Sequence, residues 1–288
     1  MSDPVATIAF QGAPGAYSDL ACRQVFPDLA TLPCAAFEDA VAAVHDRRAA
    51  LAMLPVENSV AGRVADIHRL LPESGLHIVG EHFQRVEHHL LAVPGATLSG
   101  LREVRSHVHA LSQCRTLIRT LGLQPVVAAD TAGAAAEVAA RRDPAVAAIA
   151  SELAGEIYGL ASLKENIEDA EHNTTRFLVM AGAPRPVPDD GSLVVTTFVF
   201  RVRNVPAALY KALGGFATNG INMTKLESYM VGGAFTATQF YADVEGHPAS
   251  RPLRFALEEL RFFSREVHLL GVYPGHAFRA AARNAAAE

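Results

Sequence analysis

The sequence predicts an α/β protein with at least two domains, and three observations support this prediction. Short apolar runs alternate with alanine-rich helical patterns over residues 5–180. A connection rich in proline and glycine follows at residues 181–191, and residues 192–274 show a different order of strands and helices. Because the 288 residues exceed the typical domain size of about 100–150 residues, we expect at least two hydrophobic cores.

The alternation in the first region begins with the apolar run Ala6–Phe10, which predicts a strand, and the helical pattern Asp19–Val25. Strands that alternate with helices in this way are typical of a parallel sheet covered by helices. Two extended stretches, Leu76–Phe83 and His88–Val93, interrupt this rhythm with only a polar turn between them. We expect this interruption to carry the chain between two lobes.

The segment 181–191 contains three prolines and two glycines, which predicts an exposed, semi-rigid linker. Residues 192–274 then read as strand, helix, strand, strand, helix and strand, with Gly232-Gly233 as a turn signal between the two middle strands. This βαββαβ order is that of a ferredoxin-like domain. Residues 275–288 form a C-terminal tail whose structure the sequence leaves open.

The charge and hydropathy of the sequence argue against nucleic-acid and membrane partners. A formal net charge of −5 and the absence of a Lys and Arg cluster provide no basic surface for a phosphate backbone, so we expect no nucleic-acid partner. The first residues, Met1–Pro4, lead directly into an apolar strand without a basic stretch, and no apolar segment has the length of a transmembrane helix. We therefore expect a cytoplasmic protein without membrane attachment.

Cysteine and histidine spacing argues against disulfides and against a metal centre. Three cysteines without a Cys-x-x-Cys spacing are typical of ordinary buried thiols rather than of a disulfide framework or a zinc cluster. Among the twelve histidines, His88 and His89 are adjacent and His107 and His109 alternate, so neither pair gathers three ligands, and we expect no metal. The cysteines are Cys22, Cys34 and Cys114.

Five polar turns stand at the ends or starts of predicted strands in the first region. They are Gln11–Ser18, Pro55–Gly62, Ser106–Cys114, Asp130–Ala135 and Asn173–Phe177. Each alone fits helix capping or a structural turn, but together they offer hydroxyls, amides, helix N-termini and an arginine, which suit a small ligand such as a dicarboxylic acid. The sequence shows no nucleophile elbow, phosphate loop or obvious Schiff-base lysine, so a covalent or cofactor-dependent mechanism lacks its parts.

Taken in order, the five turns resemble the signature motifs of prephenate dehydratases, and Gly220–Ser228 is similar to part of that family's regulatory ACT domain. The resemblance covers residues 5–274. It implies a catalytic region of two α/β lobes around a cleft, like a periplasmic binding protein, followed by the ACT domain. It also implies that prephenate is converted to phenylpyruvate, with loss of carbon dioxide and water, in L-phenylalanine biosynthesis and without a cofactor.

The resemblance further implies roles for individual residues. Thr175 would donate a hydrogen bond or a proton to the departing ring hydroxyl, and a neighbour or a water would share the proton because a threonine hydroxyl is a weak acid. Arg176 would fix a carboxylate or hold the turn of Thr175, and Glu57 is a candidate second acid. Substrate contacts are expected from Gly12, Gly15, Ser18, Asn58, Ser59, Ser106, Gln113 and Thr131.

The expected ACT domain predicts self-association as a dimer or tetramer and control by an amino acid. In the family, phenylalanine binds between two ACT domains at a Gly-Ala-Leu turn and a Glu-Ser-Arg-Pro segment. Here Asn204–Leu209 reads Asn-Val-Pro-Ala-Ala-Leu and Glu227–Met230 reads Glu-Ser-Tyr-Met, so the response to L-phenylalanine is open. The corresponding effector positions are Val205, Ala207, Leu209, Asn219, Asn222, Glu227 and Ser228.

Two alternatives follow from the same sequence. An enzyme on this skeleton that prefers arogenate would give phenylalanine directly, and a single pocket residue could shift that preference. A two-lobed region joined to an amino-acid-binding domain would also suit a ligand sensor without catalysis. The intact Thr175-Arg176-Phe177 turn argues against an inactive site.

Overall fold

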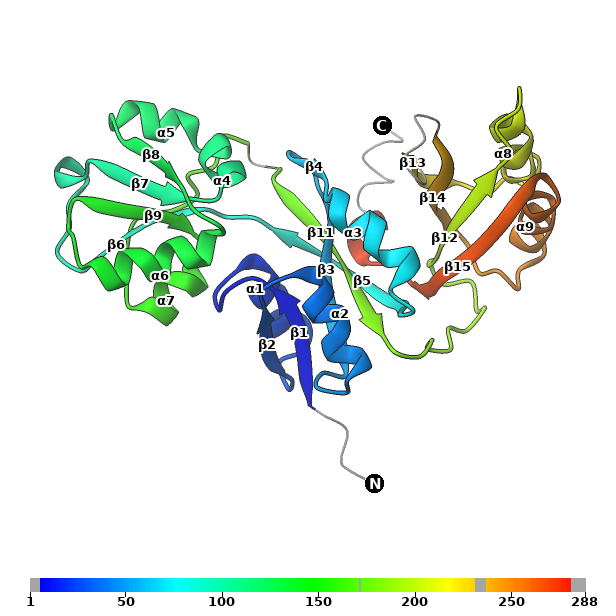
Figure 1. Ribbon diagram of the computed structural model, residues 1–288, viewed down its shortest axis with the longest axis horizontal. Helices are drawn as coiled ribbons and strands as arrows, with labels where there is room; N and C mark the ends of the chain where they lie inside the picture. The colour runs from blue at the N-terminus through cyan, green and yellow to red at the C-terminus, as the bar shows by residue number, and fades with distance from the viewer. Residues whose placement is uncertain (1–5, 171, 231–236, 281–288) are drawn as a thin grey trace. The chain divides into compact units, whose positions relative to one another are not determined.

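The computed structural model describes residues 6–170, 172–230 and 237–280, and Figure 1 shows their helices and strands. Two expectations from the sequence fall outside these ranges. The Gly232-Gly233 turn and the part of the C-terminal tail from residue 281 onward lie outside the described residues. The predictions made for them stay predictions.

The chain divides into two compact units, each assembled from two segments. The first unit comprises Met1–Ile67 and His82–Phe177, and the second comprises His68–Glu81 and Leu178–Glu288. The segment His68–Glu81 belongs with the C-terminal part of the chain because Ile78 of β5 (His77–Arg85) pairs in parallel with Gly271 of β15 (Ser264–Pro274). The predicted linker therefore lies inside the second unit rather than at its border.

Three elements run across the borders of the units in sequence. Helix α3 (Ala65–Leu70) and β5 enclose the segment that joins the second unit, with the 3-10 turn η1 (Leu71–Glu73) between them. Strand β11 (Thr174–Ala181) begins in the first unit and ends in the second. These elements are the covalent connections between the two units.

The first unit contains two sheets, each the centre of one α/β lobe (Figure 1). In the first lobe, β1 pairs in parallel with β2 and β3, and the short β4 forms a hairpin with β3. Ile8, Ala9 and Phe10 of β1 are fully buried, as expected for a parallel strand covered on both faces, and the predicted parallel arrangement is confirmed. The elements are β1 (Thr7–Gln11), α1 (Tyr17–Val25), β2 (Ala30–Cys34), α2 (Phe37–His45), β3 (Leu51–Asn58) and β4 (Gly62–Arg63).

The second lobe is built on a five-stranded mixed sheet with the order β10-β6-β9-β7-β8. The central β9 is buried along its whole length, and the small buried side chains of Ala132 and Ala135 let α6 pack closely on the sheet. Because β5 and β6 belong to different sheets, the interruption seen in the sequence carries the chain between lobes as predicted. The elements are β6 (His89–Ala92), η2 (Leu98–Gly100), β7 (Glu103–Ser106), α4 (Val108–Gln113), α5 (Arg115–Thr120), β8 (Gln124–Val127), α6 (Thr131–Arg141), β9 (Val146–Ala150), α7 (Glu152–Tyr158) and β10 (Ala161–Lys164).

The C-terminal part of the second unit has the element order that the sequence predicts. Its antiparallel strands have the order β13-β14-β12-β15 at one end of the ten-stranded sheet that also contains β1, β2 and β3, and α8 and α9 cover one face of these strands. Phe198 and Phe200 of β12 pack with Phe216 of α8 and Leu257 of α9 in one buried cluster. The elements are β12 (Val194–Val202), α8 (Ala208–Thr218), β13 (Met223–Met230), β14 (Ala237–Glu245) and α9 (Arg251–Phe263), followed by β15.

The structure shows the state of the cysteines, the spacing of potential metal ligands and the lengths of the helices. All three cysteines are buried and unpaired, which confirms the prediction of buried thiols, and burial raises the pKa of Cys22 and Cys114. In the described ranges, no group of three or more His, Cys, Asp or Glu is placed to hold a metal ion. None of the helices in the described part of the chain is both long and apolar enough to cross a bilayer.

A buried ion pair ties the residues after β15 to the second unit. The Arg279 guanidinium contacts the Glu81 carboxylate twice, with Nε at 2.6 Å and Nη2 at 2.9 Å, and the Glu81 side chain is fully buried. A second buried carboxylate, that of Asp243, lies 3.9 Å from Arg279 Nη2. The Glu81 carboxylate also accepts a hydrogen bond from the His276 backbone at 3.0 Å. The start of the predicted tail is therefore anchored.

We predict that Arg279→Met lowers the free energy of unfolding by about 3 kcal/mol, because it removes the guanidinium that pairs with the buried Glu81 carboxylate and lies 3.9 Å from that of Asp243. Urea denaturation of the full chain measures this change. Arg201→Met is the matched control, since its pair with Glu266 is exposed and should change the stability by less than about 1 kcal/mol. Equal effects of the two substitutions would show that the buried pair has no special role.

Candidate active site

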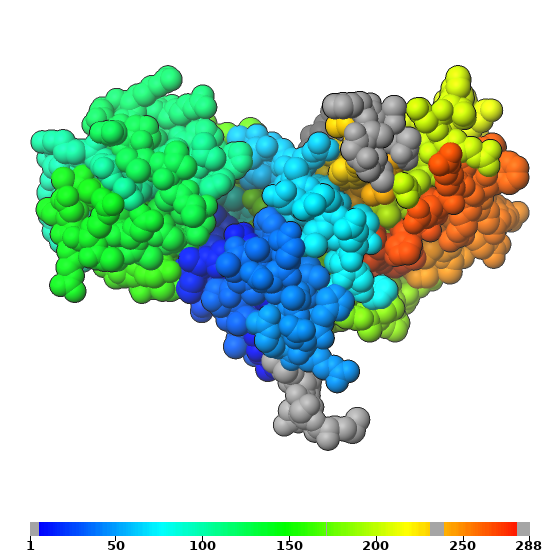
Figure 2. All heavy atoms as spheres, viewed as in Figure 1, coloured from blue at the N-terminus to red at the C-terminus, as the bar shows by residue number. Residues whose placement is uncertain are grey.

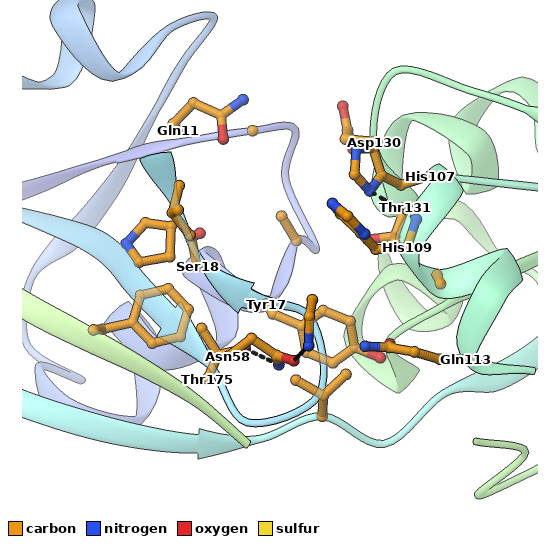
Figure 3. A pocket seen from close by; sticks show the side chains of 18 of the residues that line it. Gln11, Tyr17, Ser18, Asn58, His107, His109, Gln113, Asp130, Thr131 and Thr175 are labelled. Atoms are coloured by element: carbon orange, nitrogen blue, oxygen red, sulfur yellow. Dashed lines mark hydrogen bonds between the residues drawn. The ribbon is translucent and has the colours of Figure 1, made fainter. Parts of the chain in front are cut away.

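A cavity of about 610 Å³ lies between the two lobes of the first unit. In the space-filling view, the N-terminal strands with α2 (blue) form one mass and the second lobe (green) forms another (Figure 2). Figure 3 shows that Gln11, Ser18 and Asn58 reach the cavity from the first lobe and that His107 and Thr131 reach it from the second. A cavity of this size between two lobes suits a small molecule.

Part of the wall from the first lobe comes from the carboxyl ends of β1 and β3, where open α/β sheets place their ligands. Gly12 follows β1 with a φ of 122°, and a side chain there would place a Cβ 3.1 Å from Ala16 Cβ. Ser18 stands in the first turn of α1, and Asn58 ends β3. Thr175 lies at the start of β11. All four predicted residues line the cavity.

The wall from the second lobe comes from both ends of α4 and from the start of α6. Gln113 is the last residue of α4, and Thr131 is the first residue of α6. The Asp130 side chain caps α6 by accepting a hydrogen bond from Gly133 N at 2.7 Å, which fixes the turn that presents Thr131. The free N–H groups of the helix start favour a negative ligand group at this wall.

The Thr175 hydroxyl is oriented by Asn58. Two backbone N–H groups, those of Val60 and Ala61, donate to Asn58 Oδ1 at 2.9 Å and 2.8 Å. The Asn58 amide nitrogen therefore faces the other way and donates to Thr175 Oγ1 at 2.9 Å and to Asn173 Oδ1 at 2.8 Å. Because Thr175 Oγ1 accepts this bond, its own proton remains for a group in the cavity.

The hydrogen bonds continue from Asn173 into the second lobe. Asn173 Nδ2 donates to Gln113 Oε1 at 3.0 Å, and His88 Nε2 lies 2.9 Å from the same oxygen. On the other side of the ring, His88 Nδ1 lies 2.9 Å from the Tyr17 hydroxyl, which is also 2.7 Å from the carbonyl oxygen of Glu87. One chain of polar groups thus connects Thr175 with a buried histidine and a tyrosine.

Burial shifts the pKa of the two ring systems in this chain. Burial lowers the pKa of His88 from its usual value, while the hydrogen bond to Gln113 and the charge of Glu168 oppose the shift. Burial also raises the pKa of Tyr17. The pKa of His107 in the opposite wall is lowered by burial and by the neighbouring His109. The neutral forms of His88 and His107 are therefore favoured near neutral pH.

Two residues predicted as catalytic, Arg176 and Glu57, do not line the cavity. The Arg176 side chain is only 3% exposed, and its guanidinium donates to Glu57 Oε1 at 2.9 Å and lies over the Phe83 ring at 5.9 Å from the ring centre. The pair joins β3 to β11, the strands that carry Asn58 and Thr175. Of the two roles expected for Arg176, this geometry favours holding the turn of Thr175.

Three predicted substrate-binding residues likewise lie outside the lining. The Ser59 hydroxyl donates to His172 O at 2.7 Å and accepts from Thr174 N at 2.9 Å, so it joins two backbone segments. The fully buried Ser106 hydroxyl donates to Ile149 O at 2.6 Å. Gly15 has a φ of 89°, and a Cβ there would lie 2.7 Å from Ala154 Cα. The two hydroxyls thus bond to backbone groups, and Gly15 allows the close approach of Ala154.

The cavity also contains residues that sequence reasoning did not assign to the site. From the sequence, His88 and His107 were considered only as metal ligands, and Tyr17, within the turn Gln11–Ser18, was given no role. The positions of these residues next to strand ends were the signal that could have assigned them to the site. Arg63 in β4 is the only arginine or lysine among the described residues of the lining. The other lining residues with polar side chains that were not assigned are Gln11, Asp66, His109 and Asp130.

The predicted effector residues lie in the second unit, around α8 and in β13. Ala207, with a φ of 60°, is the N-cap of α8, and Val205 just before it is exposed. Asn219 donates to Gly215 O at 2.8 Å, and Asn222 donates to Glu245 Oε2 at 2.7 Å. The remaining positions are Leu209 in α8, and Glu227 and Ser228 in β13.

The fold and the cavity define a two-lobed α/β protein whose first unit contains a cavity of small-molecule size lined by polar side chains. A family model described as prephenate dehydratase matches residues 8–185. A bifunctional N-acyl-homoserine lactone acylase/prephenate dehydratase of Komagataeibacter europaeus is 59% identical over 272 residues, which cover 94% of this chain and 97% of that protein. The chain therefore belongs to the prephenate dehydratase family.

Other relatives extend this comparison. An arogenate dehydratase/prephenate dehydratase 1 of Arabidopsis thaliana, described as chloroplastic, is 40% identical over 94% of this chain and 73% of its own length. The structure of GqqA, described as a novel type of quorum quenching acylase, is 59% identical with a TM-score of 0.89 and covers 95% of this chain and 99% of its own. The prephenate dehydratase of Arthrobacter aurescens in complex with L-Phe is 29% identical with a TM-score of 0.84, and the match covers 98% of each chain.

Proposed function

We propose that this chain is a prephenate dehydratase that forms phenylpyruvate in L-phenylalanine biosynthesis. The observation that carries the proposal is the orientation of Thr175, whose hydroxyl oxygen accepts from Asn58 while its proton remains for a group in the cavity. A donor held in this way by its neighbours needs no reorganisation when negative charge develops on a leaving oxygen. Membership of the prephenate dehydratase family supplies the reaction for which such a donor is suited.

The reaction requires little from the protein beyond orientation. The bond between the ring and its carboxylate breaks and releases carbon dioxide, the electron pair enters the ring, and the ring hydroxyl leaves with the formation of an aromatic product. The leaving hydroxide takes up one proton and departs as water. Because a threonine hydroxyl is too weak an acid to supply this proton, Thr175 donates a hydrogen bond to the leaving oxygen, and the one proton that the reaction consumes comes from the acid of the solvent.

The second requirement is a hold on two carboxylates. Arg63 offers a guanidinium at the rim strand β4, and its planar fork matches a carboxylate. The start of α6 at Thr131 offers backbone N–H groups on the opposite wall. A substrate with two carboxylates thus finds a guanidinium in the first lobe and the N–H groups of a helix start in the second.

Two other reactions are favoured by specific observations and enter the same test. The cavity also contains carboxylates, at Asp66 and Asp130, that suit the ammonium group of arogenate, and the Arabidopsis relative is named for both substrates. The Komagataeibacter relative is named for lactone acylase activity as well, and His107 in the cavity is a neutral candidate base for hydrolysis. A protein that senses a ligand without catalysis would leave prephenate, arogenate and the lactone unchanged.

The test is to incubate the purified full chain with prephenate, with arogenate and with an N-acyl-homoserine lactone. We expect phenylpyruvate from prephenate at a rate well above the spontaneous one. Phenylalanine from arogenate alone, or lactone hydrolysis alone, would replace the proposal with the corresponding reaction. The expected cytoplasmic location stays a prediction.

We predict that Thr175→Val lowers kcat by about 100-fold with little change in KM, because one oriented donor to a developing oxyanion is typically worth this much. Steady-state kinetics with prephenate measure both constants. Thr174→Val is the matched control, since neighbouring side chains of a strand point to opposite faces and Thr174 does not line the cavity. An unchanged kcat in Thr175→Val would remove Thr175 from the mechanism.

We predict that Arg63→Gln raises KM for prephenate by about tenfold, because a charge-assisted hydrogen bond to a carboxylate is lost, and that kcat changes much less. Arg48→Gln in the same lobe is the control, since that side chain is exposed and pairs with exposed Asp46 at 3.8 Å. A KM that stays the same in Arg63→Gln would move carboxylate binding to other groups of the cavity.

We also propose that residues 192–274 are an ACT regulatory domain that pairs with a second copy and responds to L-phenylalanine. The βαββαβ order supports this, as does the complex of the Arthrobacter relative with L-Phe. In the described sheet, β13 is an edge strand whose Leu226 and Met230 are exposed apolar residues. Such an edge is a template for strand pairing, so we place the contact between copies there.

We predict that Leu226→Glu converts the dimer or tetramer to a monomer and abolishes any response to L-phenylalanine, because it places buried charges in the paired edge. Light scattering measures the mass, and activity is followed with and without the amino acid. Phe262→Glu, at a highly exposed position of α9, is the control with the same chemical change. Removing residues 192–288 is not a clean test, since β5 would lose its pairing with β15.

A further inference from the structure

The orientation of each amide near Thr175 follows from a fixed starting point. The two backbone N–H groups on Asn58 Oδ1 leave its amide nitrogen as the donor to Asn173 Oδ1. Asn173 must then present its own amide nitrogen to Gln113 Oε1. Gln113 Oε1 is thus an acceptor, and the Gln113 amide nitrogen lies on the other side of the carboxamide, at the cavity wall (Figure 3).

A second donor on Gln113 Oε1 comes from His88. The His88 Nε2 atom lies 2.9 Å from that oxygen, and the residue is only 2% exposed. Because an amide oxygen can only accept, Nε2 must carry a proton. The neutral ring then has its lone pair on Nδ1 and accepts from the Tyr17 hydroxyl at 2.9 Å, so in this state the single hydroxyl proton is not donated to the Glu87 carbonyl oxygen 2.7 Å away.

We infer that His88 is a positioning residue for the reaction, whose Nε2–H holds the Gln113 carboxamide with its NH2 group toward the substrate and keeps the amide chain to Thr175 in one orientation. The inference rests on the proposed function. While the ring proton stays on Nε2, rotation of the Gln113 carboxamide by half a turn would bring its NH2 group against two donors, from His88 and from Asn173, and lose two hydrogen bonds at once. If Asn173 were the only donor to Gln113 Oε1, as in a variant without His88, the same rotation would lose one hydrogen bond.

The charged and titratable groups around His88 allow this role in both protonation states. Glu168 accepts the His88 backbone N–H at 2.9 Å, Tyr17 of α1 faces Nδ1, and Glu87 and His89 flank the residue. If the ring gains a proton, Nε2–H still donates to Gln113, while Nδ1–H donates to Tyr17 and the tyrosine hydroxyl donates to the Glu87 carbonyl. A positioning role therefore predicts no break in the pH profile of kcat that belongs to His88, whereas a proton-transfer role predicts one.

The first test uses nitrogen NMR of the full chain with labelled histidine, with His88→Gln to assign the signal. We expect a neutral ring protonated at Nε2 at pH 7.5 and a pKa below the ordinary value of about 6.5. This measurement does not depend on the reaction. A ring protonated at Nδ1 alone overturns the inference even if the protein turns prephenate over.

The second test compares two substitutions that keep different halves of the ring. In His88→Gln the amide nitrogen reaches the place of Nε2 and can still donate to Gln113, whereas in His88→Asn the amide lies near Nδ1. We expect kcat/KM to fall at least about tenfold in His88→Asn and to recover to within about threefold of the native value in His88→Gln, with unchanged pH profiles. Thermal unfolding of both variants shows whether stability differs.

His89→Gln is the matched control, because His89 is a buried neighbour whose Nδ1 lies 3.1 Å from Ser162 Oγ and which does not line the cavity. We expect native kinetics for it. Equal losses in His88→Asn and His88→Gln, or a pH break that disappears with the histidine, overturn the positioning role in an active enzyme. A native chain that turns over neither prephenate nor arogenate overturns the proposed function instead, and the kinetic part of the inference with it.

Discussion

The two backbone hydrogen bonds on Asn58 Oδ1 are the constraint on which the candidate site depends. They form because the chain turns immediately after β3, with Gly62 at a φ of 84° where β4 begins. A carbonyl oxygen that already accepts two bonds leaves no choice for its amide nitrogen, so Asn58 must donate to Thr175 and Asn173. A local turn thus sets the direction of a chain of bonds that reaches the second lobe.

The Arg176–Glu57 pair supports the same arrangement from behind the cavity. The guanidinium is almost fully buried, whereas the Glu57 side chain is 32% exposed, so the pair is not a fully desolvated ion pair. Its effect is to fix β11 against β3 at the residues next to Thr175 and Asn58. Arg176 can therefore be needed to hold Thr175 in position without contacting the ligand itself. Its substitution would then affect turnover through the position of Thr175.

The sequence predicted where the cavity lies but not which polar groups face it. The turns at the carboxyl ends of strands indicated a ligand site, and the family resemblance that they carry assigned Gly12, Asn58 and Thr131 to it; all three line the cavity. Ser106 and Ser59 were assigned from the same resemblance, yet their hydroxyls donate to backbone carbonyls. A sequence does not reveal whether a hydroxyl is already occupied, because the partner lies far along the chain.

Long-range pairing also explains what the sequence could and could not predict of the second unit. The order of elements from β12 to β15 follows from local patterns and agrees with the structure. The inclusion of His68–Glu81 does not, because it depends on a strand pair nearly 200 residues apart, Ile78 with Gly271, and on the Glu81–Arg279 pair. Such contacts combine residues that are individually unremarkable in sequence. The same limit applies to His88, whose role follows only from partners contributed by α1 and α4.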